Sequence, residues 1–156
     1  MGSLMRETDE TDRTTPAALY RHSLRLLVEK DMDGWVGLWA EDGLFEFPFA
    51  PPGAPARIEG REAVADYIRD YPQHIDIHDI PYLEIHETRD PETIVVEMRT
   101  EGLIVATGEP FDFSYIAVVT VRHGRITRYR DYWNPQKMPA SMKPTAPATN
   151  PASSTD

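Results

Sequence analysis

The sequence predicts an α+β fold in which three N-terminal helices pack on one face of a curved, mostly antiparallel sheet. Two observations lead to this prediction. Apolar residues recur at helical spacing in the first half of the chain, and in the second half they alternate with the period of a strand. No internal repeat is visible, and a length of 156 residues fits one domain with a single core.

The first half of the chain contains three stretches with helical character. The first begins at Thr15-Pro16, where a capping residue precedes a proline in the first turn. Asp33 is expected to cap the second, a short helix with Trp35 and Trp39 on one face. The third follows Gly60 and carries apolar residues three and four positions apart.

Strands account for most of the remaining domain. One strand is expected at residues 44–49, with its alternate phenylalanines on one face, and a short one at residues 57–59. After Pro72 the alternation predicts four longer strands, at residues 74–87, at 93–107, at 111–122 and through the stretch that ends near Trp133.

The domain formed by these elements is expected to span residues 16–137. Residues 1–15 are polar and charged, which predicts a flexible N-terminal arm. Residues 138–156 are rich in proline, alanine, serine and threonine, which predicts a disordered tail.

The charge balance restricts the partners that the chain can have. There are 26 acidic and 16 basic residues, and the net charge is -10. Nucleic acid and anionic membranes are therefore not expected as partners. Cysteine is absent, so no thiol or disulfide chemistry is available. We find no stretch with the length of a membrane span and no signal peptide, so a cytoplasmic protein is expected.

The last predicted strand carries a carboxylate between two aromatic rings. Tyr129, Asp131 and Trp133 share one face because side chains alternate along a strand, and the intervening residues face the other way. Burying an unpaired charge is costly. Either this face is solvated, or Asp131 has a partner and a function.

Two motifs in the first half of the chain resemble those of a known fold family. The chain resembles the NTF2-like cone fold at Trp39-Ala40-Glu41-Asp42-Gly43 and at Gly60-Arg61-Glu62-Ala63-Val64. Within that fold it is most similar to the SnoaL-like group of cofactor-independent enzymes, over about residues 16–137. The resemblance implies a small-molecule enzyme without a cofactor, and a homodimer formed through the exposed face of the sheet.

Two SnoaL-like subfamilies resemble the chain more specifically. Phenazine biosynthesis A/B proteins are similar at Glu87-Thr88-Arg89-Asp90-Pro91, at Val96-Glu97 and at Arg130-Asp131-Tyr132-Trp133-Asn134-Pro135. A glutamate with an acid/base role stands in them where Asp131 stands here, and a histidine of their third helix is replaced by Tyr67. This resemblance implies that Asp131 transfers protons.

Limonene epoxide hydrolase is similar in a different way. Its catalytic Asp–Arg–Asp trio aligns with Glu101, Arg99 and Asp131. That enzyme also holds a water molecule with a tyrosine and an asparagine, and Phe45 and Phe47 take their places here. Phenylalanine cannot hold a water molecule, so the epoxide hydrolase interpretation is the weaker of the two.

The residues themselves suggest a charged network in the site. Arg99 and Glu101 lie two apart in a strand and therefore share one face. If that face is also the face of Asp131, one arginine lies between two carboxylates and positions them for proton exchange. The alternative is a structural ion-pair network with no catalytic role. Tyr115 is the expected hydrogen-bond donor to a substrate oxygen.

Aromatic and apolar residues from several segments are expected to bind the substrate. A sheet curled around helices leaves room for a planar or polycyclic ligand, although some of these rings belong equally well in the core. The substrate-binding candidates are Trp39, Phe45, Phe47, Tyr67, Tyr71, Leu103, Phe113 and Trp133.

No metal or cofactor is expected. His74, Asp76 and His78 alternate on one strand face and could chelate an ion. The isoleucines between them mark the opposite face as the buried one, so this face is expected to be solvated. Glycine-rich phosphate loops and zinc motifs are absent from the sequence.

Three functions remain open on the sequence. The first is acid/base isomerisation, cyclisation or condensation of a small apolar metabolite, in secondary metabolism such as antibiotic biosynthesis. In this hypothesis Asp131 exchanges the proton, and Arg99 and Glu101 set its position. The second is hydrolysis of an epoxide, and the third is non-catalytic binding of a small molecule or dimerisation.

Overall fold

The computed structural model describes residues 15–137, and the predictions for the N-terminal arm and the C-terminal tail lie outside them, Thr15 excepted. The chain first forms two helices, α2 (Pro16–Glu29) and α3 (Met32–Val36). A strand pair follows, β1 (Trp39–Glu46) and β2 (Arg57–Glu59). Helices α4 (Arg61–Ile68) and α5 (Tyr71–His74) precede the remaining strands.

Four long strands complete the domain. They are β3 (Ile75–Glu87), β4 (Thr93–Ile104), β5 (Pro110–Arg122) and β6 (Arg125–Trp133), and a 3-10 turn, η2 (Pro135–Lys137), ends the described chain. The six strands form one sheet in the order β2-β1-β6-β5-β4-β3. All neighbours are antiparallel except β1 and β6, which are parallel, so the sheet is mixed.

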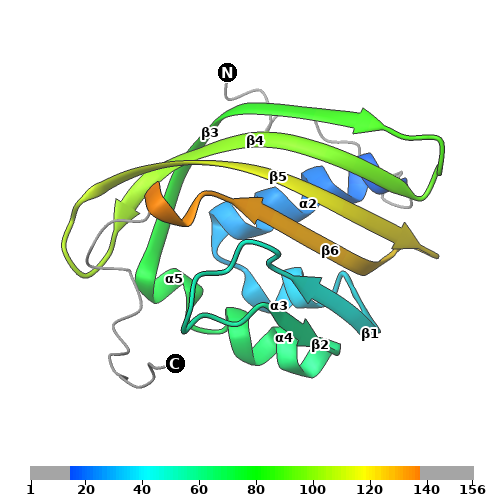
Figure 1. The fold of residues 1–156 in the computed structure, drawn as a ribbon, viewed down its shortest axis with the longest axis horizontal. Helices are drawn as coiled ribbons and strands as arrows, with labels where there is room; N and C mark the ends of the chain where they lie inside the picture. The colour runs from blue at the N-terminus through cyan, green and yellow to red at the C-terminus, as the bar shows by residue number, and fades with distance from the viewer. Residues whose placement is uncertain (1–14, 138–156) are drawn as a thin grey trace.

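The helices lie on one face of this curved sheet and leave the other face open (Figure 1). The α+β class is therefore confirmed. The described residues contain four α-helices rather than three, because the predicted third helix ends at Ile68 and Tyr71 begins a separate short one. None of the helices between residues 15 and 137 is both long enough and apolar enough to cross a bilayer.

The second predicted helix is wrong in its bounds. Asp31, not Asp33, caps α3, and its carboxylate accepts a hydrogen bond from the amide of Gly34 at 2.9 Å. Trp39 is the first residue of β1 and pairs with Ile126 of β6. Pairing with a strand distant in the sequence thus overrides a local helical pattern.

The core forms where α2 meets the helix-covered face of the sheet. Tyr20 and Leu24 on α2 are almost completely buried, as are Val96 of β4 and Val119 of β5. Strand β4 alternates without a break between buried and half-buried residues, as expected for a strand with one covered face. The concave, covered face of the sheet is therefore the side on which an enclosed site can form.

The N-terminal cap of α2 provides a first test of local stability. The hydroxyl of Thr15 accepts a hydrogen bond from the amide of Ala18 at 3.2 Å. Thr15→Ala is expected to lower the free energy of unfolding by about 1 kcal/mol, because it leaves that amide without its capping partner. Urea unfolding of both proteins measures the difference. Thr15→Ser retains the hydroxyl and serves as the control, and an equal loss in that variant would contradict the capping role.

Candidate active site

A cavity of about 450 Å³ lies between the helices and the concave face of the sheet. Its walls come from helices α2 to α5, from β1 and the loop after it, and from the inward side chains of β3 to β6. Most of the lining is aromatic or aliphatic, and no lysine or arginine lines the cavity within the described part of the chain. A small number of polar groups inside an apolar pocket is typical of a small-molecule site.

Asp131 is the acidic group that β6 directs into this cavity. Tyr129, Asp131 and Trp133 all line it, so the predicted shared face of the last strand is confirmed. The Oδ1 atom of Asp131 is buried without a hydrogen-bond partner. Burial raises the pKa of the Asp131 carboxyl from 3.8 to about 7, because an apolar environment disfavours the charged form. This carboxyl can therefore both accept and release a proton near neutral pH.

Three tyrosines share the cavity with Asp131. Tyr67, Tyr71 and Tyr115 line the cavity, and burial is the main cause that raises the pKa of each phenol. The negative charge of Asp131 raises the pKa of each further. These phenols thus keep their protons at neutral pH and remain available as hydrogen-bond donors.

The family assignment follows from the sequence over this same region. The model of the SnoaL-like domain matches residues 20–129, which include the helices and strands that form the cavity. This chain belongs to the SnoaL-like domain family. The family resemblance predicted from the motifs is therefore confirmed.

Two relatives and one solved structure are similar to this SnoaL-like chain. The chain is 45% identical over 115 residues to the uncharacterised protein YesE of Bacillus subtilis (strain 168), a match that covers 74% of this chain and 78% of that protein. It is 40% identical over 114 residues to the uncharacterised PhzA/B-like protein PA3332 of Pseudomonas aeruginosa, a match that covers 73% of this chain and 80% of that protein. A crystal structure of a Bacillus subtilis protein named as a candidate isomerase is similar with a TM-score of 0.76 and 41% identity, covering 83% of this chain and 91% of that one.

The predicted network around Asp131 is not present in this SnoaL-like domain. Arg99 and Glu101 lie on the opposite, open face of the sheet, where Arg99 Nη1 is 2.8 Å from Glu101 Oε2 and 2.9 Å from Asp112 Oδ2. Strand β4 instead directs Met98 and Thr100 into the cavity. The expectation that Arg99 and Glu101 share the face of Asp131 is therefore wrong.

A signal for the correct face was present in the sequence. Ile94, Val96 and Met98 alternate with the charged residues of β4, and the apolar set of a one-sided strand faces the core. Arg99 and Glu101 fall on the other set. The epoxide hydrolase interpretation required all three members of its charged trio in one site, so it loses its structural basis.

Most of the predicted aromatic residues do line the cavity. Trp39 does not, because its ring is completely buried in the core and stacks on Tyr129 with centroids 6.0 Å apart. Leu103 does not either, since it belongs to the outward set of β4. Those that line the cavity are Phe45, Phe47, Tyr67, Tyr71, Phe113, Tyr115 and Trp133.

A pair of tyrosines at the site could not be predicted from the sequence. The hydroxyls of Tyr20 and Tyr129 are 3.0 Å apart, and the Tyr20 hydroxyl also donates to Met98 Sδ at 3.7 Å. Tyr129 lines the cavity, whereas Tyr20 lies behind it in the core. Helical spacing marked Tyr20 as a core residue but could not show that its hydroxyl meets the last strand.

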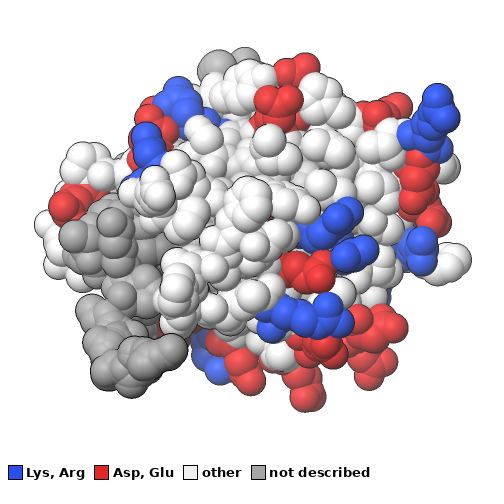
Figure 2. All heavy atoms as spheres, viewed as in Figure 1, with Lys and Arg blue, Asp and Glu red and all other residues white. Residues whose placement is uncertain are grey.

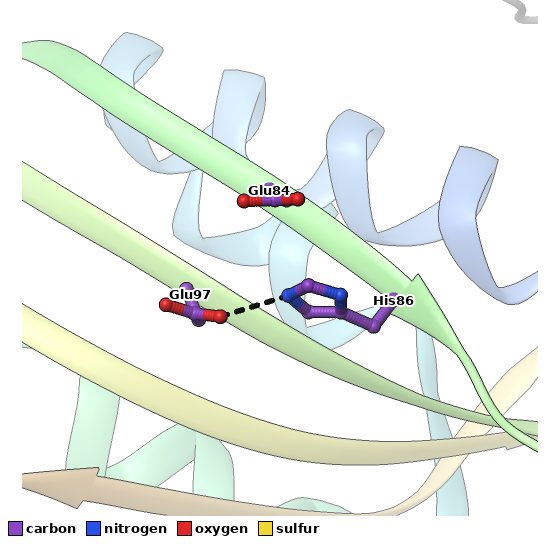
Figure 3. A group of neighbouring side chains, drawn as sticks. All are labelled: Glu84, His86 and Glu97. Atoms are coloured by element: carbon purple, nitrogen blue, oxygen red, sulfur yellow. Dashed lines mark hydrogen bonds and ion pairs between the residues drawn. The ribbon is translucent and has the colours of Figure 1, made fainter.

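One other group of side chains has the spacing of a metal site. The ligand atoms of Glu84, His86 and Glu97 lie within 4.8 Å of one another, on the open face of the sheet and away from the cavity (Figure 3). His86 Nε2 is 2.8 Å from Glu97 Oε2. His74, which was considered with Asp76 and His78, instead ends α5 and lines the cavity. Asp76 pairs with Lys30 and His78 at the surface.

The corrected position of Glu101 gives a direct prediction. Glu101→Gln is expected to change turnover by less than about twofold, because its carboxylate faces solvent and Arg99 on the side of the sheet away from the cavity. Steady-state kinetics of the variant measures this effect. A large loss of turnover in a variant that folds normally would show that Glu101 takes part in catalysis.

Proposed function

We propose that this SnoaL-like domain is a cofactor-independent acid/base enzyme that isomerises, cyclises or condenses a small, largely apolar metabolite. The main support for the proposal is the position of Asp131 in the cavity together with the raised pKa of its carboxyl group. A carboxyl group with a pKa near 7 at the wall of an apolar cavity meets the requirement for a general acid or base, whose best pKa lies close to the working pH.

The proposed reaction is a proton transfer at carbon. Asp131, as the carboxylate, takes a proton from a carbon next to a substrate carbonyl, and the electron pair moves onto the carbonyl oxygen. Tyr115 is the proposed donor to that oxygen, because its hydroxyl lines the cavity and its only hydrogen bond among the described residues is a long one, 3.5 Å from Thr100 Oγ1. Asp131 then returns the proton to the new carbanion position, to the oxygen or to a leaving group, according to the reaction.

The shape and chemistry of the cavity indicate the substrate class. Rings from α3, β1, β5 and β6 face a space of about 450 Å³, which suits a planar or polycyclic molecule. A strongly anionic substrate is disfavoured, since the lining offers no arginine or lysine. Similarity to a PhzA/B-like protein favours a metabolite of a secondary pathway.

Exchange of carbon-bound hydrogen tests the proposal without knowledge of the natural substrate. Purified protein is incubated in D₂O with a panel of bicyclic and tricyclic ketones, and NMR follows deuterium incorporation next to the carbonyl. Catalysed exchange is the expected result for members that fit the cavity. Ketones that bind and raise the melting temperature without any accelerated exchange would show a binding module instead of an enzyme.

A further inference from the structure

The buried oxygen of Asp131 lacks the hydrogen bond that such an atom normally has. Oδ1 of this side chain has no partner among residues 15–137, although the cavity around it is lined with tyrosines. Buried polar groups are hydrogen-bonded in the great majority of cases, so an exception in a folded protein needs a physical cause. The contacts of Tyr129, two residues away on β6, supply one.

The side chain of Tyr129 lies next to Asp131 in the wall of the cavity. Asp131 is opposite Ala117 of β5, and Tyr129 and Met98 belong to the inward-facing rows on either side of that pair. The Tyr20 hydroxyl is 3.7 Å from Met98 Sδ and 3.0 Å from the Tyr129 hydroxyl. Tyr129 and Met98 therefore approach each other across the row of Asp131, where the small side chain of Ala117 leaves room.

The influence of Asp131 on the two phenols agrees with this placement. Burial is the main cause that raises the pKa of Tyr20 and of Tyr129, and the negative charge of Asp131 raises both further. A charge acts in this way on groups that lie close to it. The Tyr129 hydroxyl is thus near enough to Asp131 to interact with it, yet it bonds elsewhere.

The hydrogen bonds of the tyrosine pair run away from Asp131. A methionine sulfur carries no proton, so Tyr20 is the donor to Met98 Sδ. A hydroxyl has a single proton, so the bond between the two phenols is donated by Tyr129 to Tyr20. The proton of Tyr129 therefore points toward α2 and away from the carboxyl group beside it.

We propose that the Tyr20–Tyr129 pair withholds a hydrogen-bond donor from Asp131 and so keeps its carboxyl group ready to take a proton from a substrate. A donor to the carboxylate would stabilise the charged form and make Asp131 a weaker base. Tyr20 acts through Tyr129 and is a positioning residue. The role rests on the proposed function, since the base that the pair maintains is the one that the reaction needs.

The other groups around the cavity do not replace the missing donor. Burial, and no neighbouring charge or hydrogen bond, raises the pKa of Asp131. The basic side chains of the open face lie on the other side of the sheet (Figure 2), and no lysine or arginine of the described chain lines the cavity. The remaining titratable groups of the lining are Tyr67, Asp70, Tyr71, His74 and Tyr115.

Titration of Asp131 by NMR of ¹³C-labelled aspartate tests the proposal without a substrate. Tyr20→Phe is expected to lower the midpoint of Asp131 by about 1 to 2 pH units, because the buried hydroxyl of Tyr129 loses its acceptor and turns to Oδ1. Tyr129→Phe removes the donor itself and should leave the midpoint near the wild-type value. The double variant should titrate like Tyr129→Phe, which shows that Tyr20 acts through Tyr129.

Met98→Leu provides a second route to the same shift and leaves both tyrosines in place. Leucine has nearly the volume of methionine but no acceptor. Tyr20 then donates to Tyr129, and the freed proton of Tyr129 turns to Asp131. The midpoint of Asp131 should again fall, so the test remains decisive if Tyr20→Phe does not fold.

The contrary outcomes separate this role from the proposed function. An unchanged midpoint in Tyr20→Phe, or in Met98→Leu if the first variant does not fold, would overturn the role of the pair. A double variant that titrates like Tyr20→Phe would do the same. In either case a wild-type midpoint near pH 7 and catalysed deuterium exchange would still support acid/base chemistry by Asp131. The expected shifts without any exchange would support the tyrosine pair and contradict the enzyme.

Discussion

Asp131→Asn is expected to lower turnover by about 10²- to 10⁴-fold, the usual contribution of a general acid or base. The amide has nearly the shape of the carboxyl group but cannot accept a proton at neutral pH. Because Asp131 lines the cavity with a buried Oδ1, the substitution removes the proton acceptor and leaves the apolar walls unchanged. Substrate binding should therefore persist while the chemical step is lost.

Deuterium exchange into a ketone that the wild-type protein turns over measures this loss. Asp112→Asn is the matched control, because Asp112 lies on the open face and pairs there with Arg99. The control should retain nearly all of the exchange rate. If Asp131→Asn and the control were equally active, proton transfer by Asp131 would be contradicted.

The same substitution is expected to stabilise the protein at alkaline pH. The Asp131 pKa is about 7 in the folded state and near 3.8 when the carboxyl is exposed, so the folded protein holds this proton more tightly than the unfolded chain. Stability contributed by the protonated group is then present below pH 4 and is lost as the pH rises to about 7. Each factor of ten in proton affinity corresponds to about 1.4 kcal/mol, which gives a cost of about 4 kcal/mol above pH 7.

Urea unfolding between pH 4 and pH 8 measures this dependence. Asn does not ionise, so Asp131→Asn should exceed the wild-type free energy of unfolding by about 2 to 4 kcal/mol at pH 8, with the difference shrinking toward pH 4. Asp112→Asn is the matched control here too, because its carboxylate lies on the open face and pairs there with Arg99. A constant difference across this pH range would mean that Asp131 is ionised in the folded protein throughout.

Features that depend on one segment of the chain alone could be predicted from the sequence. The face shared by Tyr129, Asp131 and Trp133 follows from alternation alone, and the cap at Thr15 follows from local chemistry. Such features need no knowledge of distant contacts. The α+β class could be predicted for the same reason, since the change from helical to strand period is visible along the chain.

Features that depend on how two strands face each other could not be predicted in the same way. Spacing put Arg99 and Glu101 on one face of β4, but it could not say that this face is the open one. The predicted network placed Arg99 and Glu101 on the inward face of β4. Ile94, Val96 and Met98 occupy that face instead. Burial of these three side chains is favourable, whereas burial of the charged ones is costly, so packing decided against the network.

Trp39 and Phe49 show the same limit at β1. A tryptophan near a short helix was assigned to that helix, yet its backbone pairs with β6. Phe49 continues the alternation of Phe45 and Phe47 in the sequence, but β1 ends at Glu46 and Phe49 is 58% exposed. Its contact with Tyr132 places it on the open face of the sheet.

The proposed acid/base role depends on the protonation state of Asp131, which NMR can measure. Selective ¹³C labelling of aspartate allows NMR to follow the side-chain carbonyl carbon of each residue as the pH changes, and Asp131→Asn identifies the signal. We expect a titration midpoint near pH 7 for Asp131, because burial disfavours the charged form of its carboxyl group. A midpoint near pH 4 would show that this carboxyl is ordinary, and the proposed acid/base role would be contradicted.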